Sequence, residues 1–392
     1  MPVQWHASIP SAELASEDCD VFWMRRCLQL AQRGLGGASP NPLVGCVIVN
    51  KAGKLIGEGF HAKAGEAHAE VDALRQVCEA QELGYLGADD LKGATVYVNL
   101  EPCCHTGKTG PCTDALKEAG IGTVVCGTLD PNPLVSGQGR DALQRAQISV
   151  RVGVLEEECA ELNCVFFHAM TTRKPYVTLK LAATLDGRLG PRQSAWMTSD
   201  MARQEVHQLR SYSDAILTTA NTVFSDNPRL TVREGLVGKN PNVRQPLRVV
   251  LDRHNRLEAM PHCHVLDTAE APTLRVVGSG VMVSHIDDAF LVVADTGTGL
   301  DLTQLMTGLC ERGVTSVWVE AGGTLAGSLL DAQLVNRLKL YTPPLILGDT
   351  STPPMISGRL CGNLSQAIGW NVLNRYTLEN TSVLDATPIY PA

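Results

Sequence analysis

Residues that could hold a metal ion and move protons lie between Gly65 and Cys112. His68 and Glu70 stand two positions apart in G-E-A-H-A-E-V-D-A-L, and Cys103 and Cys112 follow within E-P-C-C-H-T-G-K-T-G-P-C. One imidazole and two thiolates suit Zn²⁺, and three protein ligands leave the fourth position of the metal open for water. The residue types therefore predict a catalytic zinc site made of His68, Cys103 and Cys112.

Glu70 is the expected proton shuttle of this site. A His-x-Glu followed by Pro-Cys and a second Cys is typical of zinc-dependent nucleobase deaminases, in which the Glu moves protons and is not a ligand. These enzymes usually place two residues between the Cys, whereas eight separate Cys103 from Cys112. The alternatives are a closed structural zinc site, with Cys104 or His105 as fourth ligand, or no metal. Neither needs a Glu in this position, so we favour catalysis.

The hydrophobic pattern predicts the elements that carry these residues. Strands alternate with helices, and several strands are continuously apolar, which predicts a largely parallel sheet with helices on both faces. His68 and Glu70 would both lie in the first turn of a helix, where the long Glu must fold back to reach the same point as the His. The expected helices are 21–33, 67–80, 111–119 and 156–170, and the expected strands are 43–49, one ending at 61, 95–100, 123–130 and 148–154.

A polar joint with a proline, T-T-R-K-P at 171–175, predicts a boundary between a domain over residues 1–173 and a domain over 174–392. A chain of 392 residues is too long for one ordinary core. Strands and helices alternate again in the second half, which predicts a second α/β domain. Its expected strands are 176–182, 215–219, 247–252, 274–277, 291–294, 316–320, 338–341 and 376–378, and its expected helices are 200–211, 302–312 and one after 321–327.

Charged residues of the second half could bind a phosphorylated ligand. Arg210 and Arg233 are of the type that grips a phosphate through two hydrogen bonds. Glu320 ends an expected strand, where the ligands of open α/β sheets gather. The following run A-G-G-T-L-A-G, residues 321–327, would present backbone N–H groups at a helix N-terminus, which favours an anion. The alternatives are solvated surface charges and glycines that serve only the turn.

A second glycine motif offers a competing cofactor site in the first half. Residues 137–142 read G-Q-G-R-D-A, which fits the dinucleotide fingerprint G-x-G-x-x-A, and Glu156 follows the next strand. Residues 131–136 separate these glycines from the preceding strand, so the tight turn of the fingerprint is missing. We therefore place the cofactor in the second half.

Further candidates stand at strand ends or between the two Cys, where they could contact a pyrimidine or its phosphate. Each could equally be a turn or surface residue. They are Asn41, His61, Lys108, Asp130 and Asn132.

Composition excludes several classes of protein. A net charge of -8 and a pI near 5.7 argue against binding to nucleic acid or to a membrane surface by bulk electrostatics. No apolar run approaches the length of a membrane span. Residues 1–20 lack the apolar region of a signal peptide, so we expect a cytoplasmic protein whose 13 Cys are thiols or metal ligands.

The motifs together resemble the bifunctional deaminase/reductase family of riboflavin biosynthesis. The first half carries the two motifs above and D-P-N-P. The second carries L-K-L-A-A-T-L-D-G-R, S-A-W-M-T-S, T-V-F-S-D-N-P-R-L-T-V-R and W-V-E-A-G-G-T-L-A-G. The resemblance implies a cytidine-deaminase-like α/β/α domain followed by a dihydrofolate-reductase-like α/β domain. The first would use a zinc-activated water to remove the 2-amino group of a phosphoribosylated diaminopyrimidinone. The second would reduce the ribosyl group of the product to ribityl with NADPH.

The resemblance also assigns residues. It implies one Zn²⁺ held by His68, Cys103 and Cys112, and Glu70 as proton donor. It places Lys180 and Asp186 beside the ribose. The implied partners are small phosphoribosylated pyrimidines and a second copy of the chain in a homodimer, with no nucleic acid and no membrane. The implied NADP contacts are Ala182, Trp196, Thr222, Asp226, Gly322, Gly323, Thr324, Leu325, Ala326, Gly327 and Ser328, and the implied substrate contacts are Ser194, Arg210, Leu230, Arg233 and Glu320.

Overall fold

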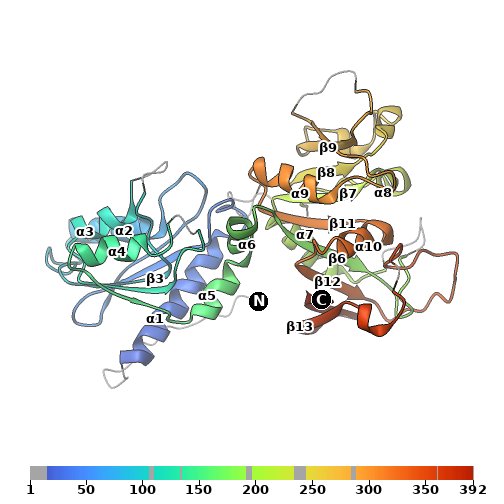
Figure 1. The fold of residues 1–392 in the computed structure, drawn as a ribbon. Helices are drawn as coiled ribbons and strands as arrows, with labels where there is room; N and C mark the ends of the chain where they lie inside the picture. The colour runs from blue at the N-terminus through green and yellow to red at the C-terminus, as the bar shows by residue number, and fades with distance from the viewer. Residues whose placement is uncertain are drawn as a thin grey trace. The chain divides into compact units, whose positions relative to one another are not determined.

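The computed structural model describes residues 16–105, 110–132, 135–190, 197–233, 244–283, 288–359 and 361–391. The chain divides into two compact units between Thr171 and Thr172, each built on its own sheet (Figure 1). Lys108, Ser194 and Trp196, which the sequence assigned to the sites, lie outside the described residues. No described helix is both long enough and apolar enough to cross a membrane.

The first unit has a five-stranded sheet in the order β2-β1-β3-β4-β5. The expected largely parallel sheet is only half right, because β1 runs antiparallel to both β2 and β3, while β3, β4 and β5 are parallel. Its elements are α1 Ser16–Ala31, β1 Gly45–Val49, β2 Leu55–Phe60, α2 Ala69–Glu82, β3 Thr95–Leu100, α3 Cys112–Glu118, β4 Thr123–Thr128, α4 Gln138–Arg145, β5 Ser149–Val152, α5 Glu156–Leu162 and α6 Cys164–Thr172.

Helices cover both faces of this sheet, as Figure 1 shows. Successive side chains of a strand point to opposite faces. Cys46 and Ile48 of β1 pack in the core beneath α2, α3 and α4, whereas Val47 and Val49 pack with α1 and α5. The continuous apolar run of β1 is thus explained by burial on both sides.

The helix expected over 156–170 is two helices, α5 and α6. Asn163 lies between them and is 2% exposed. Its side-chain carbonyl accepts from the N–H of Leu43 at 2.8 Å, and its amide donates to the carbonyl of Leu43 at 3.0 Å. A buried amide must be satisfied, and here it ties the segment before β1 to the break between the helices.

The second unit has a nine-stranded sheet in the order β10-β9-β8-β7-β11-β6-β12-β14-β13. Strands from β10 to β12 pair in parallel, and β14 is antiparallel to both of its neighbours. Its elements are β6 Tyr176–Ala182, α7 Asp200–Ser211, β7 Ala215–Thr219, α8 Ala220–Asp226, β8 Leu247–Leu251, β9 Thr273–Gly278, β10 Phe290–Val293, α9 Leu302–Glu311, β11 Ser316–Glu320, α10 Gly323–Asp331, β12 Arg337–Thr342, β13 Gly369–Leu378 and β14 Thr381–Ile389.

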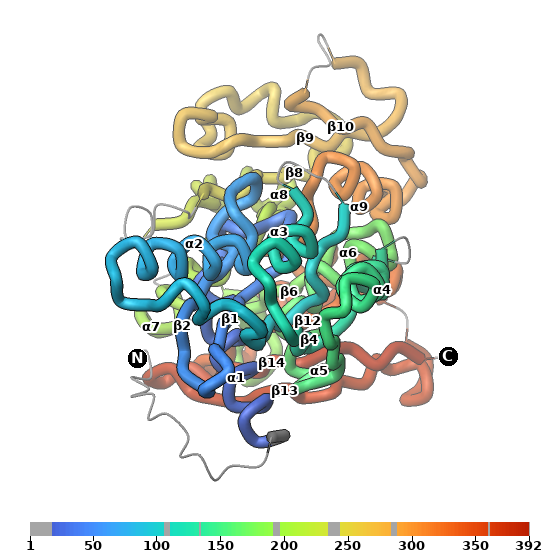
Figure 2. The backbone as a smooth tube through the Cα atoms, turned by 90° about the vertical axis from the view of Figure 1, so that its left-hand side faces the viewer, coloured from blue at the N-terminus to red at the C-terminus, as the bar shows by residue number. Residues whose placement is uncertain are grey.

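Two elements of this unit, α8 and β14, were not predicted. β14 pairs with β13 over the length of a long hairpin, seen as the red tube in Figure 2. Elsewhere α9 and α10 pack on one face of the sheet, and α7 and α8 pack on the other. Because β8, β7, β11 and β6 are parallel neighbours, their carboxyl ends line a single edge of the sheet. That edge carries the candidate site of this unit.

Two glycines of α10 allow the helix to lie against the segment 354–357. A Cβ on Gly327 would fall 2.0 Å from the carbonyl oxygen of Ser357, and one on Gly323 would fall 2.4 Å from that of Pro354. Gly322 differs, because a Cβ there would meet nothing within 4 Å.

We expect Gly327→Ala to lower the free energy of unfolding by about 1–3 kcal/mol, because the added methyl overpacks the contact. The higher helix propensity of Ala, about 1 kcal/mol, offsets this only in part. Gly322→Ala is the matched control and should change stability little. Thermal unfolding of both variants measures the difference, and a Gly327→Ala variant as stable as its control would contradict the packing argument.

Candidate active sites

The structure brings His68, Cys103 and Cys112 together. Their ligand atoms all lie within 4.8 Å of one another. Nδ1 of His68 is 3.2 Å from Sγ of Cys112 and 3.5 Å from Sγ of Cys103. Among the residues that the structure describes, neither Cys104 nor His105 joins this group. An open three-ligand arrangement therefore fits better than the closed four-ligand alternative.

His68 lies just outside the helix, which corrects its expected place in the first turn. It is the N-cap of α2, with φ -72° and ψ 162°, and the helix begins at Ala69. The extended backbone at His68 removes the helical offset of about 200° between its side chain and that of Glu70. Glu70 reaches the same point, since its carboxyl group interacts with the thiol of Cys112.

Burial sets the proton affinities at this site. Glu70 is 3% exposed, and burial, with the nearby charge of Cys103, raises the pKa of its carboxyl group. Hydrogen bonds from Cys112 and His68 hold the pKa of Cys103 at about 4, against burial. Cys112 shares a proton with the sulfur of Cys103, and this hydrogen bond, together with burial, raises the pKa of Cys112. Two sulfurs that share one proton beside an imidazole are a donor set that fits Zn²⁺.

Asn41 and His61 form a wall beside the metal ligands. His61 is 2% exposed, and its ring meets that of His68 edge to face at 5.3 Å. Nδ1 of His61 lies 2.9 Å from the carbonyl of Ala67, and Nε2 lies 3.0 Å from the amide nitrogen of Asn41. Burial lowers the pKa of His61, so the ring is neutral and can donate at Nδ1 and accept at Nε2. The imidazole of His61 is held by the Ala67 carbonyl, and it fixes the orientation of the Asn41 amide through the bond to Nε2.

The interpretation of residues 137–142 as a dinucleotide fingerprint is wrong. The carboxylate of Glu101 takes the place of a phosphate, because it accepts from the N–H groups of Asp130, Gly137 and Arg140 at 3.1, 2.9 and 3.0 Å. A Cβ on Gly139 would lie 2.1 Å from the carbonyl of Pro102, so that glycine serves packing. Sequence reasoning missed Glu101, whose signal was its place directly before P-C-C.

Asp130 and Asn132 form a turn at the end of β4. Oδ1 of Asp130 accepts from the N–H of Asn132 at 2.8 Å. Burial raises the pKa of Asp130. The loop is held to the segment of Cys103 through Glu101, and both candidates remain predictions as substrate contacts.

A cavity of about 1,700 Å³ opens at the carboxyl edge of the second sheet. Most of the residues that the sequence assigned to NADP or substrate line it. Ala326, Gly327 and Asp186 do not line it. The assigned residues that line it are Lys180, Ala182, Arg210, Thr222, Asp226, Leu230, Arg233, Glu320, Gly322, Gly323, Thr324, Leu325 and Ser328.

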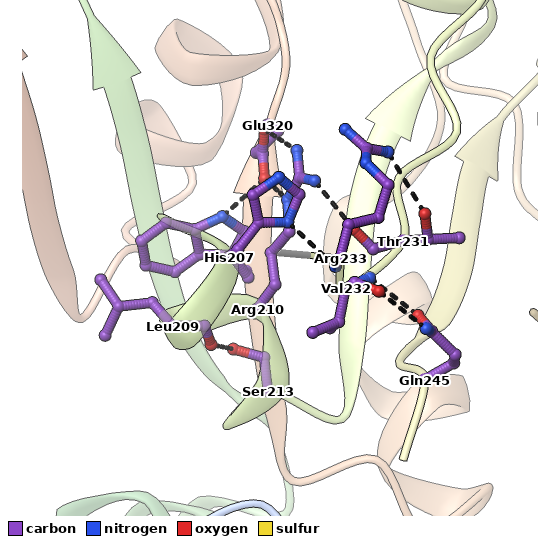
Figure 3. Close-up of polar contacts among 10 residues, drawn as sticks. His207, Leu209, Arg210, Ser213, Thr231, Val232, Arg233, Gln245 and Glu320 are labelled. Carbon is purple, nitrogen blue, oxygen red and sulfur yellow. Dashed lines mark hydrogen bonds and ion pairs between the residues drawn. The ribbon is translucent and has the colours of Figure 1, made fainter. Parts of the chain in front are cut away.

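Arg210 and Glu320 form an ion pair in the wall of this cavity (Figure 3). Nε and Nη2 of Arg210 donate to the two carboxylate oxygens at 2.5 and 2.8 Å, and the side chains are only 11% and 15% exposed. Nε1 of Trp318 donates to the same carboxylate at 2.8 Å. While this pair is intact, Arg210 cannot grip a phosphate through that edge of its guanidinium.

The charges around Glu320 determine its ionisation. Burial alone would raise the pKa of Glu320, but the charge and hydrogen bonds of Arg210, together with the charge of Lys180, hold it at about 2. Burial lowers the pKa of Lys180, against the attraction of Glu320. Lys180 and Glu320 stand opposite each other on the paired strands β6 and β11. The site therefore presents one carboxylate between two cations.

Arg233 is positioned through its backbone (Figure 3). Its N–H donates to Nδ1 of His207 at 3.3 Å, and its Nη1 donates to the hydroxyl of Thr231 at 3.3 Å. The side-chain amide of Gln245 pairs with both backbone groups of Val232, at 2.8 and 3.0 Å. These bonds fix the backbone on which Arg233 stands, and the sequence motifs had not assigned His207 or Gln245.

Asp186, which the resemblance places beside the ribose, does not line the cavity, and its role there remains a prediction. Its carboxylate accepts from the hydroxyl of Thr184 at 2.6 Å and from the N–H groups of Leu347 and Gly348 at 3.2 and 2.8 Å. It ties the turn after β6 to the loop after β12.

Comparison with known proteins agrees with this architecture. The cytidine and deoxycytidylate deaminase zinc-binding region matches residues 17–128, and the RibD C-terminal domain matches residues 175–378. The riboflavin biosynthesis protein RibD of Escherichia coli is 44% identical over 338 residues, which cover 84% of this chain and 89% of that protein. RibD of Actinobacillus pleuropneumoniae is 37% identical over 95% of this chain and 96% of its own length.

Solved structures give the same result. A structure of Acinetobacter baumannii RibD, 36% identical, matches with a TM-score of 0.84 over 96% of this chain and 100% of that one. A deaminase/reductase from Thermotoga maritima, 34% identical, matches with a TM-score of 0.82 over 96% and 100%.

Fold and sequence define a two-domain enzyme that joins a deaminase of the zinc-binding type to a reductase. The chain belongs to the RibD family of bifunctional deaminase/reductase enzymes of riboflavin biosynthesis.

Proposed function

We propose that the first unit binds one Zn²⁺ and removes the 2-amino group of 2,5-diamino-6-(5-phosphoribosylamino)pyrimidin-4(3H)-one. The second unit then reduces the ribosyl group of the resulting 5-amino-6-(5-phosphoribosylamino)uracil to ribityl with NADPH. The observation that carries the proposal is the convergence of His68, Cys103 and Cys112, with the buried carboxyl of Glu70 beside them. The Thermotoga maritima relative is described as a deaminase and reductase of these compounds.

Residues of the first unit divide the work of hydrolysis. A zinc ion held by His68, Cys103 and Cys112 would lower the pKa of a water molecule and so supply the nucleophile at neutral pH. Glu70 accepts the proton of the attacking water, passes it to the ring nitrogen, and assists the departure of ammonia. Burial raises the pKa of Glu70, which makes its carboxylate a better proton acceptor than an exposed one.

Residues of the second unit orient the reactants. NADPH, when bound, supplies the hydride that the anomeric carbon of the open-chain sugar receives. Lys180 and Glu320, opposite each other on paired strands, hold the sugar, and Arg233 faces its phosphate. The start of α10 at Gly322 offers open space for a cofactor phosphate, and among the described residues no side chain caps this helix start. Positioning of this kind can account for a large part of such a rate enhancement. The homodimer and the cytoplasmic location remain predictions.

A single measurement of NADPH oxidation tests both proposed activities. The purified, zinc-loaded protein is given only the diaminopyrimidinone and NADPH, and NADPH oxidation is followed. We expect oxidation, because the first unit makes the substrate of the second. After zinc removal by a chelator the trace should stay flat, and adding the uracil intermediate directly should restore it.

Measuring ammonia release as well as NADPH oxidation shows which of the two activities is missing. Ammonia release without oxidation would confine activity to the first unit. Neither ammonia nor oxidation from a folded, zinc-loaded sample would contradict the proposal.

A further inference from the structure

The ammonium group of Lys180 lines the cavity of the second unit without a hydrogen-bonding partner. Its Nζ forms neither a hydrogen bond nor an ion pair with any residue that the structure describes, and Glu320 and Arg210 act on it only through their charge. The four-carbon stem of a lysine is flexible, so an ammonium that nothing holds can take several positions. If Lys180 is to meet one sugar in one orientation, another group must hold it in place.

The ring of Tyr341 is placed to hold this ammonium. Nζ of Lys180 lies 5.8 Å from the centre of the ring, within the range of a cation–π interaction. Tyr341 stands on β12 opposite Ala182 of β6, two positions beyond the residue that pairs with Lys180. Side chains two positions apart on a strand point to the same face of the sheet. Both side chains therefore lie on the face that α7 covers.

Tyr341 is itself fixed on several sides. It is fully buried and packs in a cluster with Ala202 of α7 and Val383 of β14. Its hydroxyl donates to Oε1 of Glu205, also on α7, at 3.1 Å. Burial, together with the charge of Glu205, raises the pKa of Tyr341, so the phenol keeps its proton. The ring therefore presents a fixed and uncharged face to Lys180.

A second tyrosine uses the same carboxylate but faces another lysine. The hydroxyl of Tyr376, on β13, also donates to Oε1 of Glu205. The centre of its ring lies 5.4 Å from Nζ of Lys339, and that ammonium is paired with Asp385 at 2.8 Å. Lys339 does not line the cavity. The two tyrosines thus share one anchor, but only one of them supports a lysine of the site.

We propose that Tyr341 is a positioning residue for the reduction, because its ring holds the ammonium of Lys180 at the sugar and Glu205 holds the ring. Tyr341 does not line the cavity, so it acts through Lys180. A cation that is already in place loses little conformational freedom when the sugar binds, and more of the interaction then serves orientation. The inference rests on the proposed reduction, in which Lys180 contacts the sugar, and adds the residue that fixes this contact.

Kinetics with the uracil intermediate test the proposal. In Tyr341→Leu the ammonium is free to move toward Glu320, which attracts it. We expect kcat/KM for this substrate to fall by about threefold to thirtyfold, the range of a cation–π interaction, with KM for NADPH near that of the parent. Tyr341→Phe keeps the ring and should keep most of the rate. Tyr376→Leu is the matched control, because it removes a ring from the same anchor that faces only Lys339, and it should react like the parent.

A double-mutant cycle shows whether Tyr341 acts through Lys180. If it does, Tyr341→Leu causes no further loss in a Lys180→Met background, whereas independent effects would add. A phenylalanine with a fully fluorinated ring, introduced at position 341, keeps the shape of the ring but reverses its quadrupole. It should lose as much rate as Tyr341→Leu, and it serves as the test if the leucine variant does not fold. Additive losses in the cycle, or an equal loss in Tyr376→Leu or Tyr341→Phe, would overturn the proposal.

A binding experiment separates this inference from the proposed reduction. Calorimetry with ribose 5-phosphate requires no turnover. Tyr341→Leu should bind this probe more weakly than the parent by the same factor, and only while Lys180 is present. Such an effect in a protein that reduces nothing would contradict the reduction and leave the positioning role standing. Binding by Tyr341→Leu that equals binding by the parent would overturn the positioning role, whether or not the protein is a reductase.

Discussion

Replacing Glu70 by Gln should lower the rate of deamination by about 10²- to 10⁴-fold, the usual contribution of a positioned acid–base group. The amide fills the same space as the carboxyl but cannot accept a proton. Glu70 is not one of the three ligands, so the variant should still bind one zinc per chain. Ammonia release and metal analysis of the same sample measure the two quantities.

Two controls make this result specific. Glu79→Gln changes an exposed carboxylate of the same helix, which is paired with Arg75, and should leave deamination unchanged. Glu70→Gln should reduce the supplied uracil intermediate at the parent rate, because the reaction belongs to the second unit. A variant that deaminates normally would return the first unit to a structural zinc site, and loss of zinc together with activity would make Glu70 a part of the metal site.

Replacing Glu320 by Gln should destabilise the second unit by about 3–5 kcal/mol, as expected when one partner of a buried ion pair is removed. The Arg210 guanidinium and the nearby Lys180 ammonium would then share a poorly hydrated site without their counter-charge. Thermal unfolding together with hydrogen exchange in β11 measures the loss where it arises. Asp331→Asn breaks an ion pair of the same unit whose carboxylate is 48% exposed, and should cost about 1 kcal/mol or less.

The same carboxylate should make stability depend on pH. Its pKa is about 2 in the folded protein, against an ordinary value of 4.5. A depressed carboxyl pKa contributes stability above pH 4.5, and that contribution is lost as the pH falls from 4.5 toward 2. Linkage puts the loss at about 3 kcal/mol. Glu320→Gln should remove this part of the acid sensitivity, and an unchanged acid profile would show that Glu320 is not the group responsible.

Local patterns predicted most of the candidate sites, because ligand type and spacing are written in the sequence. The grouping of His68, Cys103 and Cys112 in one site could be predicted from two short motifs. The position of His68 could not, because whether a residue is the last before a helix or the first within it depends on the backbone angle at that residue. The role of Glu101 also lay beyond the motifs, since its three partners come from the loop after β4 and the start of α4, about 30 to 40 residues further along the chain.

The missed elements have identifiable causes. Helix α8 is only 7 residues long, too short for its period to show. In β14 the apolar alternation is broken by Asp385, which is 4% exposed because Arg337 and Lys339 neutralise it from β12. The direction of β1 could have been predicted in part. Only a short turn joins it to β2, and such a turn favours an antiparallel hairpin.

The carboxylate of Glu101 also bears on how the protein acquires its metal. It joins the segment just before Cys103 to the loop that starts at Asp130, using only hydrogen bonds within the chain. Cys112 adds to this frame, because its N–H donates to Sγ of Cys103 at 3.4 Å. A site assembled before the ion arrives spends less of the binding energy on ordering its own loops. Zinc would then bind to and leave a site that is already folded, whereas in a zinc finger the binding of zinc is coupled to folding.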